Sequence, residues 1–146
     1  MTSLLESLES RQLMSTFMVN NLSGIGTGSL RDAIDSANAQ LGADVIEFAP
    51  GLTGTIALGG TELQVTEDLA INGPGASLLT VSGSGLSRVF NFASGSSSIS
   101  GLTISGGNAG SGGGIRGSAS SSVILNGSTV ANNSAILGGG ISTEGP

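Results

Sequence analysis

The sequence predicts an all-β fold: a right-handed, single-stranded parallel β-helix of about four coils with an α-helix that caps its N-terminal end. The first observation is a repeat with a spacing of 26 residues, because the residues at 101–104 and 112–115 return at 127–130 and 138–141. A short period with glycine at the turns is typical of a solenoid, in which each repeat is one coil. The second observation is composition. With 26 glycines, 10% charged and 38% hydrophobic residues, the chain favours short strands and tight turns over disorder.

A β-sandwich is the alternative fold, because it also places a turn every ~8–12 residues. It does not predict in-register copies 26 residues apart. Stacked coils place equivalent residues ~4.7–4.9 Å apart, so each apolar residue lies over its own copy. The right hand follows from the rule that parallel strands are joined by right-handed crossovers.

Three zones follow from the pattern. An N-terminal segment occupies residues 1–15, and a strand with the capping helix occupies 16–42. The coils occupy 43–146, and we expect them to be incomplete at the C-terminus. In the second zone, the strand is predicted at 16–19, where a β-branched residue precedes three apolar ones.

The capping helix is predicted from Leu30 to about Gln40. Ser29 stands three residues before Asp32, which is the Asp variant of a capping box. An apolar stripe follows at helical spacing, which we expect to face the first coil, and Gly42 ends the helix. The stripe consists of Leu30, Ala33, Ile34, Ala37 and Leu41.

Each coil is predicted to contain about three short strands. A pattern of strand, corner and strand recurs three times and aligns Ile71, Ile104 and Val130. Two positions after each of these stands a residue type that readily enters positive φ. The spacing of 33 residues between the first two copies predicts a local insertion near 88–92. The predicted corner residues are Gly73, Gly106 and Asn132.

No capping helix is predicted after the last strand, which begins near Ile141. An uncapped coil exposes unpaired backbone groups and apolar side chains. Val130 and Ile141 are therefore expected at a bare end. We expect this end to fray after about Asn126 or to associate end to end with another copy.

Net charge and residue composition exclude several classes of function. The net charge is −6, from ten carboxylates, four arginines and no lysine, so a basic patch for nucleic acid or for an anionic membrane is not expected. The chain has no cysteine or histidine, which excludes thiolate and histidine chemistry. No apolar run approaches the ~20 residues of a membrane span. The N-terminus also lacks the pattern of a secretory signal.

Catalysis is not predicted either. No Asp or Glu occurs at 69–143, whereas Ca²⁺ needs several oxygen ligands and glycoside hydrolysis needs a carboxyl pair. Arg88 and Arg116 are therefore predicted to be solvated side chains without acidic partners. The adjacent Glu67 and Asp68 predict a turn. No catalytic, cofactor-binding or metal-binding residue is assigned.

Several blocks of the sequence resemble the opening of a family of bacterial surface β-helix proteins. These proteins have repeats similar to those of polymorphic outer membrane proteins and belong to the pectin-lyase-like β-helices. The likeness spans residues 16–144, and its most specific block is Ser-Leu-Arg-Asp-Ala-Ile at 29–34. It implies an extracellular or cell-surface, adhesin-like scaffold of a bacterium, with a polysaccharide or a protein as partner. Further matching blocks lie at 18–21, 37–39, 44–51, 71–75 and 102–108.

The first fifteen residues resemble a second pattern, the LEPR-XLL motif at the start of large exported bacterial proteins. Ser10 replaces the proline of that motif and Met14 replaces a leucine, and the basic stretch that usually precedes it is missing. The alternative interpretation is an amphipathic terminus with no export role. The matching residues are Leu8, Glu9, Arg11, Leu13 and Ser15.

The sequence therefore favours a non-catalytic scaffold of an exported or cell-surface protein. The alternative is the N-terminal part of a pectin-lyase-like polysaccharide lyase or glycoside hydrolase whose catalytic coils lie beyond Pro146. A third interpretation is a fragment with no independent role. Clustered Asp or Glu with Arg or Lys beyond Pro146 would favour the enzyme, and further coils rich in Ser, Gly and Asn would favour the scaffold.

Overall fold

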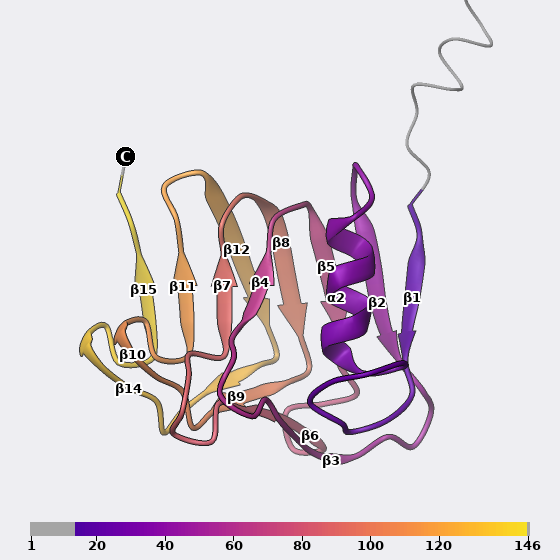
Figure 1. The fold of residues 1–146 in the computed structure, drawn as a ribbon, viewed down its shortest axis with the longest axis horizontal. Coiled ribbons are helices and arrows are strands. Elements are labelled where there is room, and N and C mark those ends of the chain that lie inside the picture. The colour runs from indigo at the N-terminus through magenta and orange to yellow at the C-terminus, as the bar shows by residue number, and fades with distance from the viewer. Residues whose placement is uncertain (1–13, 146) are drawn as a thin grey trace, which may run out of the picture.

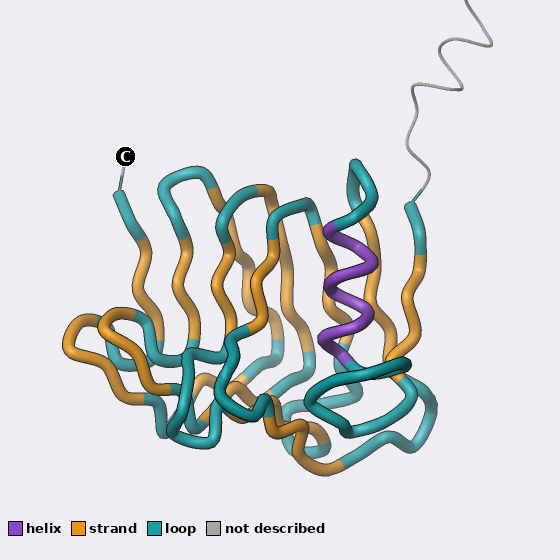
Figure 2. The backbone as a smooth tube through the Cα atoms, viewed as in Figure 1, coloured by secondary structure: helices purple, strands orange, loops and turns teal. Residues whose placement is uncertain are grey.

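The computed structural model describes residues 14–145, which form a right-handed parallel β-helix of about five turns with an α-helix at its N-terminal end (Figure 1 and Figure 2). The predicted fold class is confirmed. The turn count is slightly above the predicted four, because one sheet contains five strands, of which the first precedes the helix.

Three sheets, called A, B and C below, form the walls of the β-helix. Sheet A consists of β1 (Thr16–Val19), β2 (Asp44–Phe48), β5 (Leu69–Asn72), β8 (Gly95–Ser100) and β12 (Ser121–Asn126). Sheet B consists of β3 (Gly54–Ala57), β6 (Leu79–Ser82), β9 (Thr103–Ser105) and β13 (Thr129–Val130). Sheet C consists of β4 (Leu63–Val65), β7 (Phe90–Phe92), β11 (Ile115–Gly117) and β15 (Ile141–Thr143). A two-stranded sheet of β10 (Asn108–Ser111) and β14 (Ser134–Leu137) lies between sheets B and C along the chain.

Stacked columns of apolar side chains fill the interior. Ile46, Ile71 and Ile99 pair in register across sheet A, and all three are fully buried. Phe90 and Phe92 of β7 are also fully buried, with ring centroids 5.7 Å apart. Because apolar burial is the dominant favourable term in folding, these columns hold the turns together.

The register of the coils differs from the predicted alignment. Ile71 pairs with Ile99 in sheet A, whereas Ile104 belongs to sheet B and pairs with Val130. The predicted insertion near 88–92 is also wrong, because this stretch contains β7 and contributes to the core. The predicted alignment is wrong because Ile71 lies before the corner between sheets A and B, whereas Ile104 lies after the equivalent corner of the next turn.

Two of the three predicted corner residues are left-handed. Gly106 and Asn132 have φ values of 63° and 57°. Gly73 does not have a positive φ, so this part of the prediction is wrong, and the left-handed residues of its corner are Gly101 and Gly127 in the later turns. Gly73 is required for a different reason. A Cβ atom there would lie 2.4 Å from the carbonyl oxygen of Gly101 in the next turn.

The capping helix is α2 (Leu30–Asn38), which lies against β1, β2 and β4. It ends earlier than predicted, and Gly42, with φ of 102°, turns the chain beyond it. Leu41 is consequently 72% exposed, and its predicted inward position is wrong. Among residues 14–145, no helix combines the length and hydropathy that crossing a membrane requires. The buried residues of α2 are Leu30, Ala33, Ile34 and Ala37.

Candidate functional site

The N-terminus of α2 is held by the two residues that the sequence singled out. Ser29 is the N-cap, and its Oγ accepts a hydrogen bond from the Asp32 N–H at 3.1 Å. The Asp32 carboxylate accepts a hydrogen bond from the Gly28 N–H at 3.2 Å. In a capping box this second bond comes from the N-cap residue itself. Here the Ser29 N–H donates instead to the Gly26 carbonyl at 3.1 Å, so the box is shifted by one residue.

Arg31 fastens the helix to the first coil through backbone carbonyls. Its Nε donates to Gly24 O at 3.0 Å, and its Nη1 donates to Glu62 O at 2.8 Å. Its Nη2 donates to Thr61 O at 2.6 Å and to Leu58 O at 3.3 Å. A guanidinium offers N–H donors in a rigid planar fork. Arg31 therefore holds the segment that leads into β4.

Asn38 pairs with the edge of β4 in the way that a backbone peptide would. Its Nδ2 donates to Gln64 O at 2.8 Å, and its Oδ1 accepts from the Thr66 N–H at 3.0 Å. β4 is the edge strand of sheet C, and an open edge is a template for pairing with another chain. The Asn38 amide therefore fills part of that edge.

We call Ser29, Arg31, Asp32 and Asn38 the cap junction. Arg31 and Asn38 were not predicted to bind the coil. The signal that could have found them is their spacing of seven residues, which puts both on one face of a helix beside its apolar stripe. Polar side chains at the border of a buried stripe are well placed to reach backbone groups of the element beneath.

A second polar set lies on sheet C and begins at Arg88. Its Nη1 forms an ion pair with the Glu62 carboxylate of the turn before. It also donates to the turn after, from Nη2 to Ser111 O at 2.9 Å and from Nε to Gly112 O at 3.0 Å. Arg88 is partly buried and links three successive turns, so the prediction of a solvated arginine without an acidic partner is wrong.

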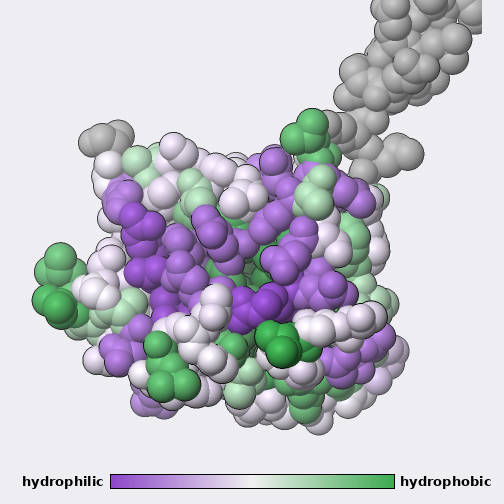
Figure 3. Space-filling view, in the orientation of Figure 1, coloured by the Kyte–Doolittle hydropathy of each residue, from purple (hydrophilic) through white to green (hydrophobic). Residues whose placement is uncertain are grey.

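Arg116 contradicts the same prediction, because it forms an ion pair with Glu144 and donates to Asn91 Oδ1 at 3.3 Å. Both acidic partners lie outside the acid-free stretch of 69–143, and stacking brings residues 26 and 28 positions apart into contact. Figure 3 shows hydrophilic residues gathered over the face that α2 and sheet C form. We call this set the polar ladder: Glu62, Arg88, Asn91, Arg116 and Glu144.

The chemistry of these groups is that of cross-links between turns. Arginine stays protonated in proteins, so Arg31, Arg88 and Arg116 act as hydrogen-bond donors. Asp68 is similar, because its Oδ1 accepts a hydrogen bond from the Ser96 N–H of the next turn at 2.7 Å. Within residues 14–145, no group of three or more His, Cys, Asp or Glu side chains is placed to hold a metal ion.

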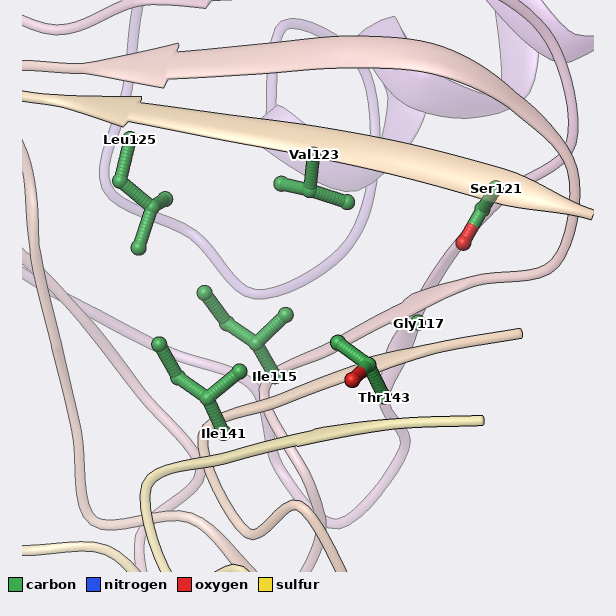
Figure 4. A pocket seen from close by; sticks show the side chains of 7 residues that line it. All are labelled: Ile115, Gly117, Ser121, Val123, Leu125, Ile141 and Thr143. Carbon is green, nitrogen blue, oxygen red and sulfur yellow. The ribbon is translucent and has the colours of Figure 1, made fainter. Parts of the chain in front are cut away.

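The last turns enclose a small apolar cavity of about 90 Å³ (Figure 4). Val123 and Leu125 of β12 face Ile115 and Ile141 across it. Ile115 is 2% exposed, whereas Ile141, its partner in the next turn, is 45% exposed. The interior therefore opens toward solvent at the C-terminal turn. The rest of the lining is Gly117, Ser121 and Thr143.

Most of the predicted export motif lies outside the described residues, namely Leu8, Glu9, Arg11 and Leu13. Ser15 is described, and its Oγ donates to Gln40 Oε1 at 2.8 Å. This contact ties the start of β1 to the chain that follows α2.

Comparison of the chain with known protein families, with curated proteins and with solved structures found no match. The function is therefore inferred from the residues themselves.

Proposed function

We propose that this chain is a non-catalytic scaffold of an exported or cell-surface, adhesin-like bacterial protein, in which the stacked coils present an extended surface. The observation that carries the proposal is the position of the arginines. Arg31, Arg88 and Arg116 donate to backbone carbonyls, carboxylates or an amide of neighbouring turns. Donors that are engaged within the protein stabilise the stacking of the turns and leave fewer groups to bind or activate a substrate.

The outer face of sheet A supports a role in presentation. Its outward side chains are small or uncharged over most of the five strands, and the Glu47 carboxylate accepts a hydrogen bond from Asn72 Nδ2 at 2.8 Å. A face of hydroxyl, amide and apolar groups suits a polysaccharide or an extracellular protein as partner, since both offer many hydrogen-bonding groups. One outward row is Thr16, Val45, Ala70, Ser98 and Ile124, and the next is Met18, Glu47, Asn72, Ser100 and Asn126.

Support for export comes from the sequence alone. The LEPR-XLL-like segment and the resemblance of residues 16–144 to bacterial surface β-helices both favour a location outside the cell or on its surface. The low charge and high glycine content agree with coils that extend a scaffold.

The polar ladder is the observation that favours the alternative, the N-terminal part of a pectin-lyase-like lyase or hydrolase. It lines up two arginines and two carboxylates on one face. The pectin-lyase-like resemblance implies lyases that hold Ca²⁺ with carboxylates and use an arginine as base. We prefer the scaffold because Arg88 is paired with Glu62 and Arg116 with Glu144. In an enzyme, these carboxylates would instead have to hold a metal ion or transfer a proton.

The catalytic alternative is tested with the purified chain on pectate, with and without Ca²⁺. The scaffold predicts no release of unsaturated or reducing sugars. Turnover that disappears in Arg88→Ala or Arg116→Ala would overturn the non-catalytic proposal. A pectate lyase in the same buffer serves as the positive control.

Export is tested separately, by producing the chain with and without residues 1–15 in a bacterial host and treating intact cells with protease. The proposal expects the full chain to be cleaved on intact cells and the shortened chain to be protected. If the full chain is protected until the cells are lysed, the cell-surface assignment is wrong.

A further inference from the structure

A cavity of about 390 Å³ lies beside the N-terminal end of α2, between the loop before the helix and the connection from β3 to β4 (Figure 1). We call it the cap cavity. It is larger than the cavity of about 90 Å³ in the last turns, and its volume falls in the range of ~300–1,000 Å³ that is typical of small-molecule sites. Ile25 comes from the loop, Arg31 from the helix, and Ala57, Leu58 and Thr61 from the end of β3 and the connection after it.

Arg31 brings a positive charge into the cap cavity that no carboxylate of the described residues neutralises. The other two arginines in the described part of the chain form the ion pairs of the polar ladder, whereas Arg31 forms none within residues 14–145. The four acceptors of Arg31 are uncharged carbonyl oxygens. Carbonyl groups orient a guanidinium but leave its net charge in place. The cap cavity therefore contains a partly buried cation in a chain whose net charge is −6.

Arg31 also keeps a hydrogen-bond donor for a ligand. A guanidinium has five N–H groups. The four bonds to carbonyls use the N–H of Nε, one N–H of Nη1 and both of Nη2, which leaves the second N–H of Nη1. The exposed Thr61 lines the same cavity, and its hydroxyl is a further donor. Donors beside a positive charge bind most strongly to an acceptor that is itself negative.

The acidic residues next to Arg31 and Thr61 in the sequence have other partners. The Glu62 carboxylate is paired with Arg88. The Asp32 carboxylate accepts a hydrogen bond from the Gly28 N–H. A negative charge for Arg31 therefore has to come from a bound molecule.

The walls of the cap cavity favour an organic anion over an inorganic one. Ile25 is 69% exposed although its side chain is apolar, and Ala57 is exposed at the end of β3. A hydrocarbon group that lies between them removes apolar surface from water, which is favourable. An inorganic anion offers no such group.

We infer that the cap cavity binds a small organic carboxylate. The carboxylate lies at the guanidinium of Arg31 and the hydroxyl of Thr61, and its hydrocarbon part lies between Ile25 and Ala57. The site is independent of the scaffold role: failure to bind a carboxylate would leave that proposal standing, and pectate turnover would leave the carboxylate site standing.

The first test is a titration of the full chain with butyrate at constant ionic strength, followed by ¹⁵N NMR. The chain has only four arginines, so the Nε–H signal of Arg31 can be resolved. This signal and the amide signals of Ile25 and Gly59 should shift and reach saturation on the order of millimolar butyrate. 1-Butanol has the same tail without the charge, and sulfate has charge without the tail. Each should bind at least about tenfold more weakly, because each lacks one of the two contacts. Equal binding of sulfate would show a general anion site and overturn the inference.

The second test fills the cavity. Ala57→Leu places a larger side chain in the volume of the ligand without removing a bond of Arg31, and it should weaken butyrate binding at least about tenfold. The matched control is Thr55→Leu, which is exposed on the same strand but does not line the cavity, and should bind like the original chain.

The third test removes the charge. Arg31→Met should abolish the saturable shifts of the Ile25 and Gly59 amides, whereas Arg116→Met should keep them. Shifts that grow without saturation, or unchanged butyrate binding in Ala57→Leu, would overturn the inference. The dispersion of the amide signals shows whether each variant is folded, and Ala57→Leu decides the question if Arg31→Met does not fold.

Discussion

The backbone groups at the strand edges are bonded differently at the two ends of the β-helix. At the N-terminal end, Arg31 donates to four carbonyls, and Asn38 bonds to an N–H and a carbonyl at the edge of β4. At the C-terminal end, β12 to β15 are edge strands, and Ile141 is 45% exposed. At the N-terminal end, side chains of α2 and its cap bond to the edge backbone groups. At the C-terminal end of the described residues, no helix covers the strand edges.

Several turns are fastened by side chains of the turn after them. Ser94 Oγ donates to Thr66 O at 2.6 Å, and Ser118 Oγ donates to Ala93 O at 2.6 Å. These two bonds run from a side chain to a carbonyl of the turn before it, whereas Arg88 donates to carbonyls of the turn after it. The first turn has partners in the cap and in the turn after it, whereas the last described turn has partners only in the turn before it. Stability should therefore fall along the chain toward residue 145.

The largest effect is expected at the cap. Ile34→Asp buries an unpaired charge at a position that is 1% exposed and should destabilise the chain by about 4 kcal/mol. Leu41→Asp, only seven residues on but exposed, is the matched control and should change stability by less than about 0.5 kcal/mol. Urea denaturation measures both. Equal stability of the two variants would show that α2 does not cap a cooperative unit.

Ile115 and Ile141 pair with each other but differ in burial. Ile115→Ala removes a buried side chain and should cost about 3 kcal/mol, whereas Ile141→Ala should cost about 1 kcal/mol because that side chain is half exposed. Thermal or urea unfolding at low protein concentration checks the difference. Equal losses would mean that the last turn is as well packed as the one before it.

The sequence was sufficient for the fold because the last two turns repeat at a constant interval. Ile115 and Ile141, or Ile104 and Val130, lie 26 residues apart in the sequence and pair in the structure. Earlier turns differ in length, which is why Ile71 was aligned with the wrong strand. A fixed interval identifies a solenoid, but it does not fix which corner each turn uses.

The site could be predicted only in part, because its contacts cross between turns. Ser29 and Asp32 lie close in sequence, so their pairing follows from local helix-capping rules. The partners of Arg88 and Arg116 depend on which residues stack in neighbouring turns. The absence of acidic residues nearby in the sequence therefore led to the incorrect prediction that these arginines have no acidic partner. Leu41 continues the helical period but lies beyond the end of α2, because the spacing of apolar residues does not indicate where a helix ends.

A smaller effect is expected from the arginines at the two ends. Arg31→Met keeps the aliphatic stem but leaves three carbonyls of the first coil and the Gly24 carbonyl without that donor, and should cost about 2 kcal/mol. Arg116→Met breaks a half-exposed ion pair with Glu144 and should cost less than about 1 kcal/mol. Chemical denaturation in low and high salt separates the cases, because only the Arg116 contribution should fall with screening. A similar loss in both variants would remove the distinction between the ends.

The smallest difference concerns two asparagines that make the same bonds. Asn133 Oδ1 accepts from the Gly107 N–H at 2.8 Å and its Nδ2 donates to Ile104 O at 3.0 Å, so it bonds to one N–H and one carbonyl, as Asn38 does at β4. Replacing either with Asp sets an oxygen against a carbonyl and should cost about 1 kcal/mol locally.

The two substitutions should differ in how much of the chain they destabilise. Asn38→Asp acts on the cap, which belongs to the cooperative unit, so it should lower global stability and speed amide exchange throughout the first turns. Asn133→Asp acts on a turn that we expect to open locally, so exchange should accelerate at Gly107 and beyond while global unfolding hardly changes. Hydrogen exchange measured on monomeric protein resolves both patterns. If Asn133→Asp lowers the protection of β2 and β5 as much as Asn38→Asp does, the last turn unfolds together with the rest, and the proposed loss of stability toward the C-terminal end is wrong.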